Sequence, residues 1–511
     1  MFNINDKNLI EDINNEFSKL IEKEEQEFEY KFEHPLDEEA RGKLKDIIID
    51  GKNSIEYSQV AQLDKLWIML INKAIKCLRF FDEREPFLNN NNKTPVAYGI
   101  DKLEAYHNRY SSFESLLYGA SSYYRDHVFH AMRTWMLGVF CLLKPMSSDK
   151  KMFINQITID GCTDDTFSSN INFFEKISMW TFIALCHDLG YPLEKSQQIL
   201  DKTQKMMKEF IPNPNIWNNF GFSGIQDNIN EYIIKFMSTK MVYQKSEEET
   251  EGNNENNETN KNSKYLYLGR VQPKYYLKYT KSLEHFDHGI ISSVIIYKML
   301  LYFLESDFNL NDDYEYKYED ARQFYIRREI LRAMASHTCT DIYNIYLTTF
   351  SSVLFLCDEL QEWGRKSWNE LYSGLQPHAV DLSIDKFTPQ EISVKENINM
   401  EQVEEEQIFC DNIKRIFERQ YENYKVIFRD GQYTQAREFN FIKKMEIKLK
   451  QSGTQENNLV IDYALKAQDQ NYFKIDLTNS CQYNTTGIKE KLEKMFEKSE
   501  YKNEVQIVPQ K

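Results

Sequence analysis

Apolar residues recur at helical spacing through the first part of the chain. Leu63, Leu66, Leu70 and Ala74, for example, lie three or four residues apart, with polar residues such as Asp64, Lys65, Asn72 and Lys73 between them. This period is typical of amphipathic helices that bury one face. We therefore predict a helical N-terminal region over residues 1–120, in which we recognise no chemical motif.

The apolar runs become nearly continuous between residues 121 and 376, which predicts the buried helices of a core domain. Two polar stretches interrupt this domain, near residues 145–172 and 244–264. The second consists almost entirely of Glu, Asn, Thr, Ser and Lys, and such a composition cannot bury enough apolar surface to order itself. We expect a surface loop there, with a tether as the alternative.

A different period begins in the last part of the chain, residues 377–511. Met445, Ile447 and Leu449 alternate with charged residues, which is the pattern of a strand with one buried face. Similar signals predict strands at 459–465, 472–477 and 505–508 and an amphipathic helix at 487–501. We expect a linker followed by a small α+β domain.

Composition favours a mainly α protein. The 511 residues are 41% hydrophobic and include only 17 Gly and 11 Pro, too few for a turn-rich all-β chain. The length predicts roughly three domains, at about 150 residues each. A formal net charge of −16 repels phosphate backbones, so we do not expect nucleic acid as a partner.

Cysteine usage and the N-terminus bear on location. The eight cysteines form no CxxC pair, which is typical of a reducing compartment. Residues 1–17 lack the basic start and apolar stretch of a signal peptide. The longest apolar run, 289–304, is shorter than the roughly 20 residues that span a bilayer. We expect a soluble cytoplasmic protein with no membrane partner.

The chemistry is expected where buried helices end in His or Asp. His187 and Asp188 directly follow the apolar run 174–186, and Gly190 with Pro192 then ends the helix. Burying a carboxylate without a partner costs several kcal/mol or shifts its pKa. A cation beside Asp188 is therefore implied.

The same construction recurs on four other predicted helices. His127 and His130 precede an apolar helix, His288 opens the apolar run 289–304, His337 lies on an apolar stripe, and Asp358 ends the run 353–357. A satisfied core histidine or a helix-terminal carboxylate explains any one of them. Because that explanation is needed five times, convergence on a metal is simpler. The residues leave His127 open beside His130, and His285 beside His288.

These residues resemble the HD-domain metal-dependent phosphohydrolases, whose ligand order is His, His-Asp, Asp on an all-helical core. The matching positions are His130, His187, Asp188 and Asp358, and the segments ALCHDLG at 184–190 and FLCDE at 355–359 look like two of the family's motifs. Members with two metals, among them cyclic nucleotide phosphodiesterases and HD-GYP proteins, add two histidines in the order of His288 and His337. The resemblance covers about half of the chain.

Two features depart from the family. Most members that have a Lys after the HD-x-Gly motif use this Lys near the phosphates, but here the position is Tyr191. The letters Gly190-Tyr191-Pro192 match a GYP motif but lie in the wrong segment of the chain for it. The spacing between motifs is also longer than in compact members, which the two polar stretches explain. We favour His130 over His127 for its His-Ala helix pattern, and His288 over His285 because it directly precedes a buried helix.

The resemblance implies the chemistry as well. Asp188 bridges two ions, and the mixed N/O ligand set suits divalent Mn, Fe, Co, Ni or Zn, with Mg as a further candidate. The implied catalytic residues are His187, Asp188 and Glu194. Three arginines are candidates for the substrate phosphate, because a guanidinium binds phosphate with two hydrogen bonds: Arg125, Arg133 and Arg365.

The resemblance therefore predicts hydrolysis of a phosphate ester by attack of metal-activated water, the substrate being a small phosphorylated molecule such as a nucleotide or cyclic nucleotide. Two alternatives stay open. One is a non-catalytic nucleotide sensor on an HD fold, and the other is an HD-type nuclease of single strands, against which the net charge argues. A homo-oligomer is compatible with either.

Overall fold

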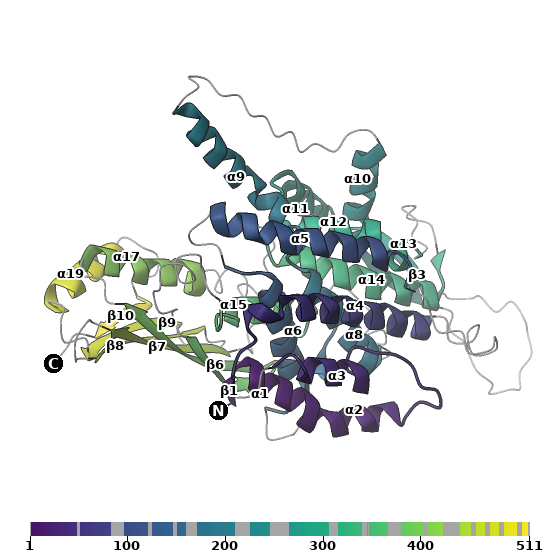
Figure 1. Ribbon diagram of the computed structural model, residues 1–511, viewed down its shortest axis with the longest axis horizontal. Helices are drawn as coiled ribbons and strands as arrows, with labels where there is room; N and C mark the ends of the chain where they lie inside the picture. The colour runs from purple at the N-terminus through teal and green to yellow at the C-terminus, as the bar shows by residue number, and fades with distance from the viewer. Residues whose placement is uncertain are drawn as a thin grey trace, which may run out of the picture.

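The structure is a computed structural model. It describes residues 2–48, 52–82, 97–120, 125–146, 151–159, 171–209, 225–245, 265–305, 315–339, 345, 347–365, 380–401, 406–422, 440–450, 456–465, 471–479, 485–497 and 503–508. Helices form one large body, and a sheet extends from one side of it (Figure 1). The prediction of a mainly α protein is confirmed.

The centre of the helical body consists of five helices that are buried over most of their length. They are α6 (Val128–Leu143), α8 (Phe173–Cys186), α12 (His288–Met299), α14 (Tyr318–Ser336) and α15 (Phe350–Leu360). Helix α8 begins with a capping box between Asn172 and Glu175 and packs against α4, α6, α14 and α15. Its all-round apolar sequence explains this central place.

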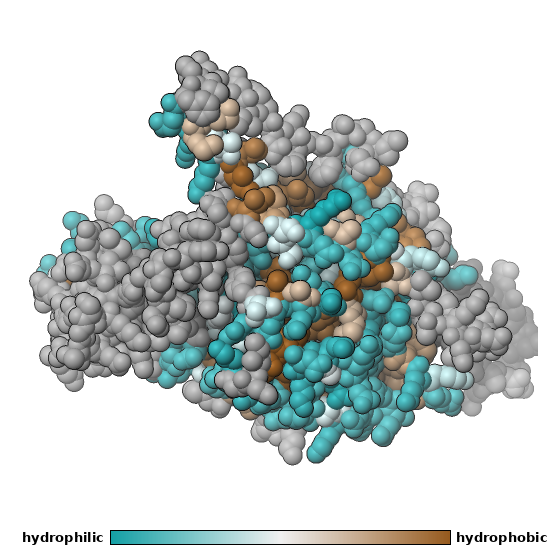
Figure 2. Space-filling view, in the orientation of Figure 1, coloured by the Kyte–Doolittle hydropathy of each residue, from teal (hydrophilic) through white to brown (hydrophobic). Residues whose placement is uncertain are grey.

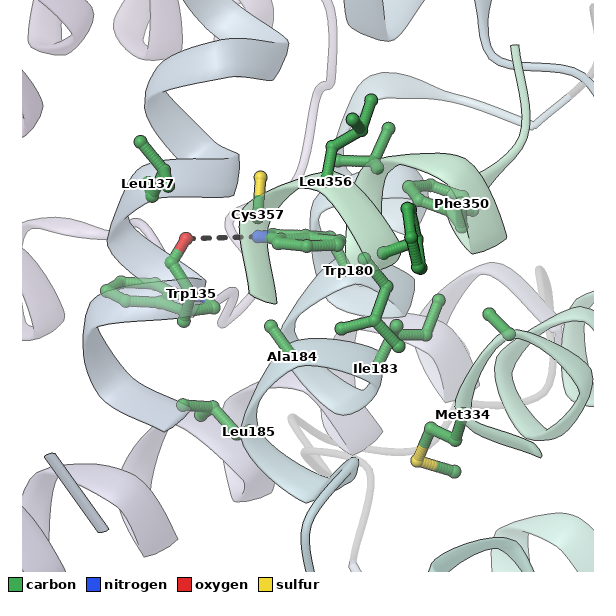
Figure 3. Close-up of a cluster of buried hydrophobic side chains, with 14 of the residues drawn as sticks. Trp135, Leu137, Trp180, Ile183, Ala184, Leu185, Met334, Phe350, Leu356 and Cys357 are labelled. Carbon is green, nitrogen blue, oxygen red and sulfur yellow. Dashed lines mark hydrogen bonds between the residues drawn. The ribbon is translucent and has the colours of Figure 1, made fainter. Parts of the chain in front are cut away.

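Two tryptophans join α8 to α6. The Nε1 atom of Trp180 donates a hydrogen bond of 3.0 Å to the carbonyl of Trp135, and Figure 3 shows both rings among apolar side chains of α6, α8 and α15. The Nε1 atom of Trp135 in turn donates to the hydroxyl of Thr181, also at 3.0 Å. Each buried indole N–H thus has a partner, as burial of a donor requires.

The N-terminal residues form helices that cover α6 and α8. These are α1 (Asp6–Glu11) with a π-helical turn at Asp12–Glu16, α2 (Phe17–Glu25), α3 (Glu38–Lys45), a 3₁₀ turn at Tyr57–Gln59, α4 (Val60–Asp82) and α5 (Ile100–Ala120). Figure 2 shows mostly hydrophilic side chains over this part of the described surface. Among the described helices, none has the length and apolarity to cross a membrane.

The remaining helices of the body surround the same centre. They are a 3₁₀ turn at Phe153–Gln156, α9 (Tyr191–Lys208), α10 (Ile225–Ser238), α11 (Pro273–Glu284) and α13 (Leu301–Leu304). Helix α9 starts directly after Gly190 and projects from the body (Figure 1).

A small antiparallel sheet, which the sequence pattern did not predict, lies within the helical body. Its strands are β2 (Thr239–Lys245), β3 (Tyr265–Val271) and β4 (Glu315–Tyr316). The register of β2 and β3 runs from Thr239 opposite Val271 to Lys245 opposite Tyr265. The polar stretch predicted as a loop therefore joins two strands of one ladder, and residues 246–264 lie outside the described residues. The same is true of 147–150 and 160–170 in the first polar stretch.

The larger sheet has seven strands in the order β1-β5-β6-β7-β8-β9-β10. They are β1 (Phe2–Ile4), β5 (Val380–Phe387), β6 (Glu391–Glu401), β7 (Asn440–Lys450), β8 (Glu456–Leu465), β9 (Tyr472–Asn479) and β10 (Val505–Val508). The β6–β7 and β9–β10 pairs are parallel and the others antiparallel.

The helices beside this sheet are α17 (Glu406–Ile416), continued by a π-helical turn at Phe417–Glu422, and α19 (Thr485–Phe496). Both lie over the same side of the sheet in Figure 1. Strand β1 pairs with β5, Phe2 lying opposite Ile384, so the N-terminal segment supplies the edge of a sheet otherwise formed by residues 380–508. The N-terminal strand is joined to β5 by backbone hydrogen bonds that no local pattern predicts.

Candidate metal centre

The ends and turns of the five central helices place six side chains together. His130 lies in the first turn of α6, His187 and Asp188 follow α8, His288 begins α12, His337 follows α14 and Asp358 lies near the end of α15. These are the six residues predicted as metal ligands. The ligand atoms within 4.8 Å of one another form three overlapping sets: His130, His187 and Asp188; His187, His337 and Asp358; and Asp188, His288 and His337.

The carboxylate of Asp188 lies between two pairs of imidazoles. Its Oδ2 atom is 3.2 Å from Nε2 of His187 and 3.8 Å from Nε2 of His130. Its Oδ1 atom is 3.2 Å from Nε2 of His288 and 3.8 Å from Nε2 of His337. Each carboxylate oxygen therefore has its own pair of ring nitrogens.

Asp358 lies closest to the first of these two groups, although its ligand atom is also within 4.8 Å of that of His337. Its Oδ1 atom is 2.6 Å from Nε2 of His130 and 3.6 Å from Nε2 of His187. We call the Oδ2 side of Asp188, with His130, His187 and Asp358, the inner side, and the Oδ1 side, with His288 and His337, the outer side. Both inner imidazoles are essentially inaccessible, whereas the His288 side chain is 17% exposed.

All four histidines use Nδ1 for a hydrogen bond within the protein. The partner of His130 is Oε1 of Gln361 at 2.6 Å, and the partner of His288 is Oε2 of Glu194 at 2.5 Å. His187 and His337 contact the backbone carbonyls three residues earlier, at 2.8 Å and 2.5 Å. Because these partners are acceptors, Nδ1 carries a proton, and Nε2 faces the centre, where it can bind an ion once it is deprotonated. This arrangement is typical of metal-ligating histidines.

Two of these nitrogens have no hydrogen-bond partner. Nε2 of His187 and Nε2 of His337 are both buried and unpaired. An unsatisfied buried polar atom costs about 1–3 kcal/mol. A divalent cation beside Asp188 would use both lone pairs, so the residues fit a metal centre.

The carboxylates and imidazoles shift one another's protonation strongly. Burial lowers the pKa of His187, but Asp188 and Asp358 outweigh it and raise this pKa to about 10. Burial likewise opposes the hydrogen bonds of His288 with Asp188 and Glu194, which raise its pKa to about 9. Burial raises the pKa of Asp188 and Asp358, but the imidazoles hold both well below the usual range. The centre thus attracts positive charge.

The two competing histidines lie outside the centre. His127 stacks on the ring of Tyr191 with centroids 3.8 Å apart, and its backbone N–H donates to Glu114. Burial holds the pKa of His127 well below the usual range. His285 is an exposed residue after α11. Neither belongs to any of the three ligand sets, so the structure places His130 and His288 at the centre.

The three predicted phosphate-binding arginines differ in their surroundings. Arg133 is 2% exposed and binds the buried carboxylate of Asp6 through Nε and Nη2 at 3.1 Å. This ion pair links α1 to α6 and engages the guanidinium that was predicted to bind phosphate. Arg125 pairs with Glu362, with Nη2 2.9 Å from Oε1. Arg365 donates a long bond of 3.4 Å to a backbone carbonyl.

Glu194 lies in the first turn of α9, where it holds His288. Its Oε2 atom accepts both from Nδ1 and, at 3.1 Å, from the backbone N–H of His288. Burial would raise its pKa, but His288 and Lys195 lower it to about 2. Glu194 therefore orients the candidate ligand His288 as an anion.

Close helix approaches around the centre require small residues. A Cβ atom at Gly190 would lie 2.4 Å from the carbonyl oxygen of His288, and one at Gly289 would lie 2.4 Å from that of Met334. The hydroxyl of Ser292 donates to the carbonyl of His187 at 2.6 Å. These contacts hold α12 against the His187-Asp188 turn.

Other supporting residues escaped the sequence analysis. Gln361 is the C-cap of α15, three residues after Asp358, and reaches His130 from there. Trp67 donates from Nε1 to the carbonyl of Leu185, and Tyr106 donates to the carbonyl of Leu189, both at 2.8 Å. These two residues come from α4 and α5, over 80 positions away in the sequence, and no local signal marks them.

Comparisons with protein-family models, curated proteins and solved structures find no significant match to this chain. The functional interpretation therefore rests on the geometry of the site.

Proposed function

We propose that the chain is a metal-dependent phosphohydrolase of the HD type, acting on a small phosphate ester such as a nucleotide or cyclic nucleotide. One observation carries the proposal. The carboxylate of Asp188 lies between two pairs of imidazole Nε2 atoms, and every one of these imidazoles has its Nδ1 engaged by another acceptor. A structural ion pair needs neither the second pair of rings nor the common orientation.

Two ions are supported by the division of the ligand set. His130, His187 and Asp358 would hold one ion on the inner side, His288 and His337 would hold another on the outer side, and Asp188 would contribute to both. Imidazole and carboxylate donors favour divalent Mn, Fe, Co, Ni or Zn over Ca, with Mg as a further candidate. When bound, such ions supply Lewis acidity and lower the pKa of a water.

The protein side chains have distinct parts in this proposal. Glu194 orients His288, and Gln361 orients His130. Hydrogen bonds to the backbone carbonyls three residues earlier keep the rings of His187 and His337 in place. Of the three arginines predicted to bind phosphate, Arg133 is paired with Asp6 and Arg125 with Glu362. Arg365 is therefore the arginine that would bind a phosphoryl oxygen in this proposal. No side-chain nucleophile is required, because water supplies the attacking oxygen.

Metal analysis followed by a substrate panel tests the proposal. We expect the purified protein, or protein reloaded with Mn²⁺ or Zn²⁺, to bind about two equivalents and to release alcohol from phosphate esters. Absence of stoichiometric binding would remove the metal centre. Tight nucleotide binding without turnover would favour the sensor, and cleavage of a labelled single-stranded oligonucleotide would favour the nuclease.

A further inference from the structure

We infer that Asp6 is a positioning residue for the inner side of the metal centre. Through Trp363 and Gln361 it holds the ring of His130 in the form that binds an ion. This inference rests on the proposed function, because it assigns a residue to the inner ion of that site. It makes the N-terminal segment, which also supplies strand β1, a requirement for tight binding of this ion.

Asp6 is a fully buried carboxylate that joins three distant segments of the chain. Its Oδ1 atom accepts a hydrogen bond of 2.8 Å from Nε1 of Trp363, and its Oδ2 atom accepts one of 2.8 Å from the backbone N–H of Ile55. Nε of Arg133 lies 3.1 Å from both oxygens. A buried charge needs such partners, so this group of contacts is costly to break.

A chain of hydrogen bonds leads from Asp6 to His130. Asp6 holds the indole of Trp363, and the backbone carbonyl of Trp363 accepts a hydrogen bond of 2.7 Å from Nε2 of Gln361. Oε1 of the same amide accepts one of 2.6 Å from Nδ1 of His130. Asp6 and His130 are therefore connected through one backbone carbonyl and one side-chain amide.

The orientation of the Gln361 amide decides which nitrogen of His130 carries the proton. Because Nε2 of the amide donates to Trp363, Oε1 faces the imidazole and requires a proton on Nδ1. Nε2 of His130 is then the nitrogen that can bind an ion. If the carbonyl of Trp363 moved away, the amide could turn and present its NH₂ group, which favours the opposite tautomer with the proton on Nε2.

Arg133 holds the same loop from the side of α6. It lies one turn after His130, and its Nη1 atom donates a hydrogen bond of 3.1 Å to the carbonyl of Gly364. Gly364 has a φ of +70°, and a Cβ atom there would lie 2.8 Å from Nη2 of Arg133. Residues 361–364 are thus held between α6 and the carboxylate of Asp6.

The larger sheet fixes the place of Asp6. Strand β1 ends at Ile4, which lies opposite Leu382 of β5, and the side chain of Asn5 then caps α1 by accepting from the backbone N–H of Asn8 at 2.8 Å. Figure 1 shows β1 and α1 where the sheet meets the helical body. A displacement of β1 relative to the body would therefore move Asp6 away from Trp363.

The outer side has different supports. His288 donates from Nδ1 to Glu194, and His337 donates to the carbonyl of Met334, and neither acceptor belongs to the loop 361–364. A change at Asp6 should therefore affect the two ions unequally. This inequality distinguishes a positioning role from a general loss of stability.

The affinity of each ion for the full chain tests the inference. Asp6→Asn keeps the size of the side chain and removes its charge. We expect the dissociation constant of the inner Zn²⁺, measured by competition with a chelator, to rise about tenfold, the lower end of the loss that follows removal of a direct partner. The outer ion should keep its affinity. Comparison with the same substitution in a His337→Ala chain, which lacks an outer ligand, assigns the weakened ion to the inner side.

Glu175→Gln is the matched control. Glu175 is likewise fully buried and pairs with Arg322, but it lies in the first turn of α8, at the end opposite His187. Its substitution should lower the melting temperature as Asp6→Asn does and leave the inner-to-outer ratio of affinities unchanged. An equal change of the ratio in both variants would overturn the inference.

A second variant keeps the test decisive if Asp6→Asn does not fold. Trp363→Phe removes the Nε1 donor and leaves the ion pair of Asp6 with Arg133 in place. The inner ion should weaken in the same direction and by a smaller factor. Unchanged inner affinity in Trp363→Phe would overturn the inference.

The proton on His130 gives a readout that requires no metal. In a metal-free chain labelled with ¹⁵N-histidine, long-range ¹H–¹⁵N spectra at alkaline pH distinguish a ring protonated on Nδ1 from one protonated on Nε2, and His130→Gln identifies the signal. We expect the Nδ1 form in wild type and in Glu175→Gln, and a mixture of both forms in Asp6→Asn and Trp363→Phe. An unchanged tautomer in the last two variants would overturn the inference.

The two measurements together separate the inference from the proposed function. A changed tautomer in a chain that binds no metal would remove the proposed function and retain the link from Asp6 to His130. Stoichiometric metal binding with an unchanged inner-to-outer ratio in Asp6→Asn would overturn the inference and leave the proposed function intact.

Discussion

The inner and outer sides of Asp188 use the same carboxylate but differ in burial and charge. The inner side holds two carboxylates and two inaccessible imidazoles, while the outer side shares one carboxylate and includes the 17% exposed His288. A cation on the inner side would have more negative charge and less competing water. The two positions are therefore expected to differ in affinity although their nitrogen donors are alike.

The hydrogen-bond partners of the imidazole Nδ1 atoms place more negative charge on the outer side than on the inner side. The inner imidazoles donate to neutral acceptors, Gln361 and a backbone carbonyl, whereas His288 donates to the Glu194 carboxylate. An anionic partner makes the ring a stronger ligand. The outer side has one carboxylate fewer to bind an ion directly, and the negative charge of Glu194 behind His288 partly compensates for this.

The largest effect is expected where the two sides meet. Asp188→Ala removes the one ligand common to both, so metal content should fall to near zero and hydrolysis should become undetectable, while circular dichroism stays helical. Asp227→Ala, at an exposed position of α10, is the control. Retained metal in the Asp188 variant would show that the two sides do not share this carboxylate.

Removing an outer imidazole should separate the two ions. We expect His337→Ala and His288→Ala each to lose about one metal equivalent, leaving the inner ion, with kcat falling by a larger factor than substrate affinity. Elemental analysis of the two variants decides this. Unchanged stoichiometry in both would make the centre mononuclear and assign these histidines another task.

The pH dependence of metal binding should also differ between the sides. In the metal-free protein the pKa of His187 is about 10 and that of His288 about 9, so both rings are protonated at pH 7 and must lose a proton to bind an ion. Affinity should therefore rise with pH by about tenfold per unit for each proton displaced, and level off near pH 9 for the outer side and pH 10 for the inner. Calorimetry in buffers of different ionisation enthalpy measures the protons released. Affinity independent of pH between 6 and 9 would contradict the assignment.

The smallest effect is expected from the second layer. Glu194→Gln preserves shape but removes the charge behind His288, and loss of such a partner typically weakens metal affinity by about 10- to 100-fold. The outer ion should weaken while the inner ion is unaffected. Gln361→Ala should do the reverse, and titration with a competing chelator compares the two. Equal weakening of both ions in either variant would show that the sides are not independent.

Part of this site was predictable because its signal is local. His187 and Asp188 follow a helix that is apolar all round, and such a helix must be buried, so its end carries an ionisable pair into the interior. His337 and Asp358 belong to similar apolar patterns on α14 and α15. The order and residue types of the candidate ligands were therefore available from periodicity together with a family resemblance.

Other choices depended on contacts between distant segments. His127 and His130 lie one turn apart, and only the packing of α9, which stacks Tyr191 on His127, separates their roles. The buried ion pair of Arg133 with Asp6, far away in sequence, is another contact that no local pattern predicts. Arg125 and Glu362 likewise meet only after folding.

The sequence by itself determined which segments are apolar enough to be buried helices and which polar residues they carry inward, because burial follows from composition and period along a few turns. It also indicated the strands near the C-terminus. Tertiary structure alone decided which atoms face one another: the division of Asp188 between two imidazole pairs, the carbonyls held by Trp67 and Tyr106, and the joining of β1 to β5. Hydrogen bonds and ion pairs act over about 3–4 Å, and a linear pattern does not specify distances between segments a hundred residues apart.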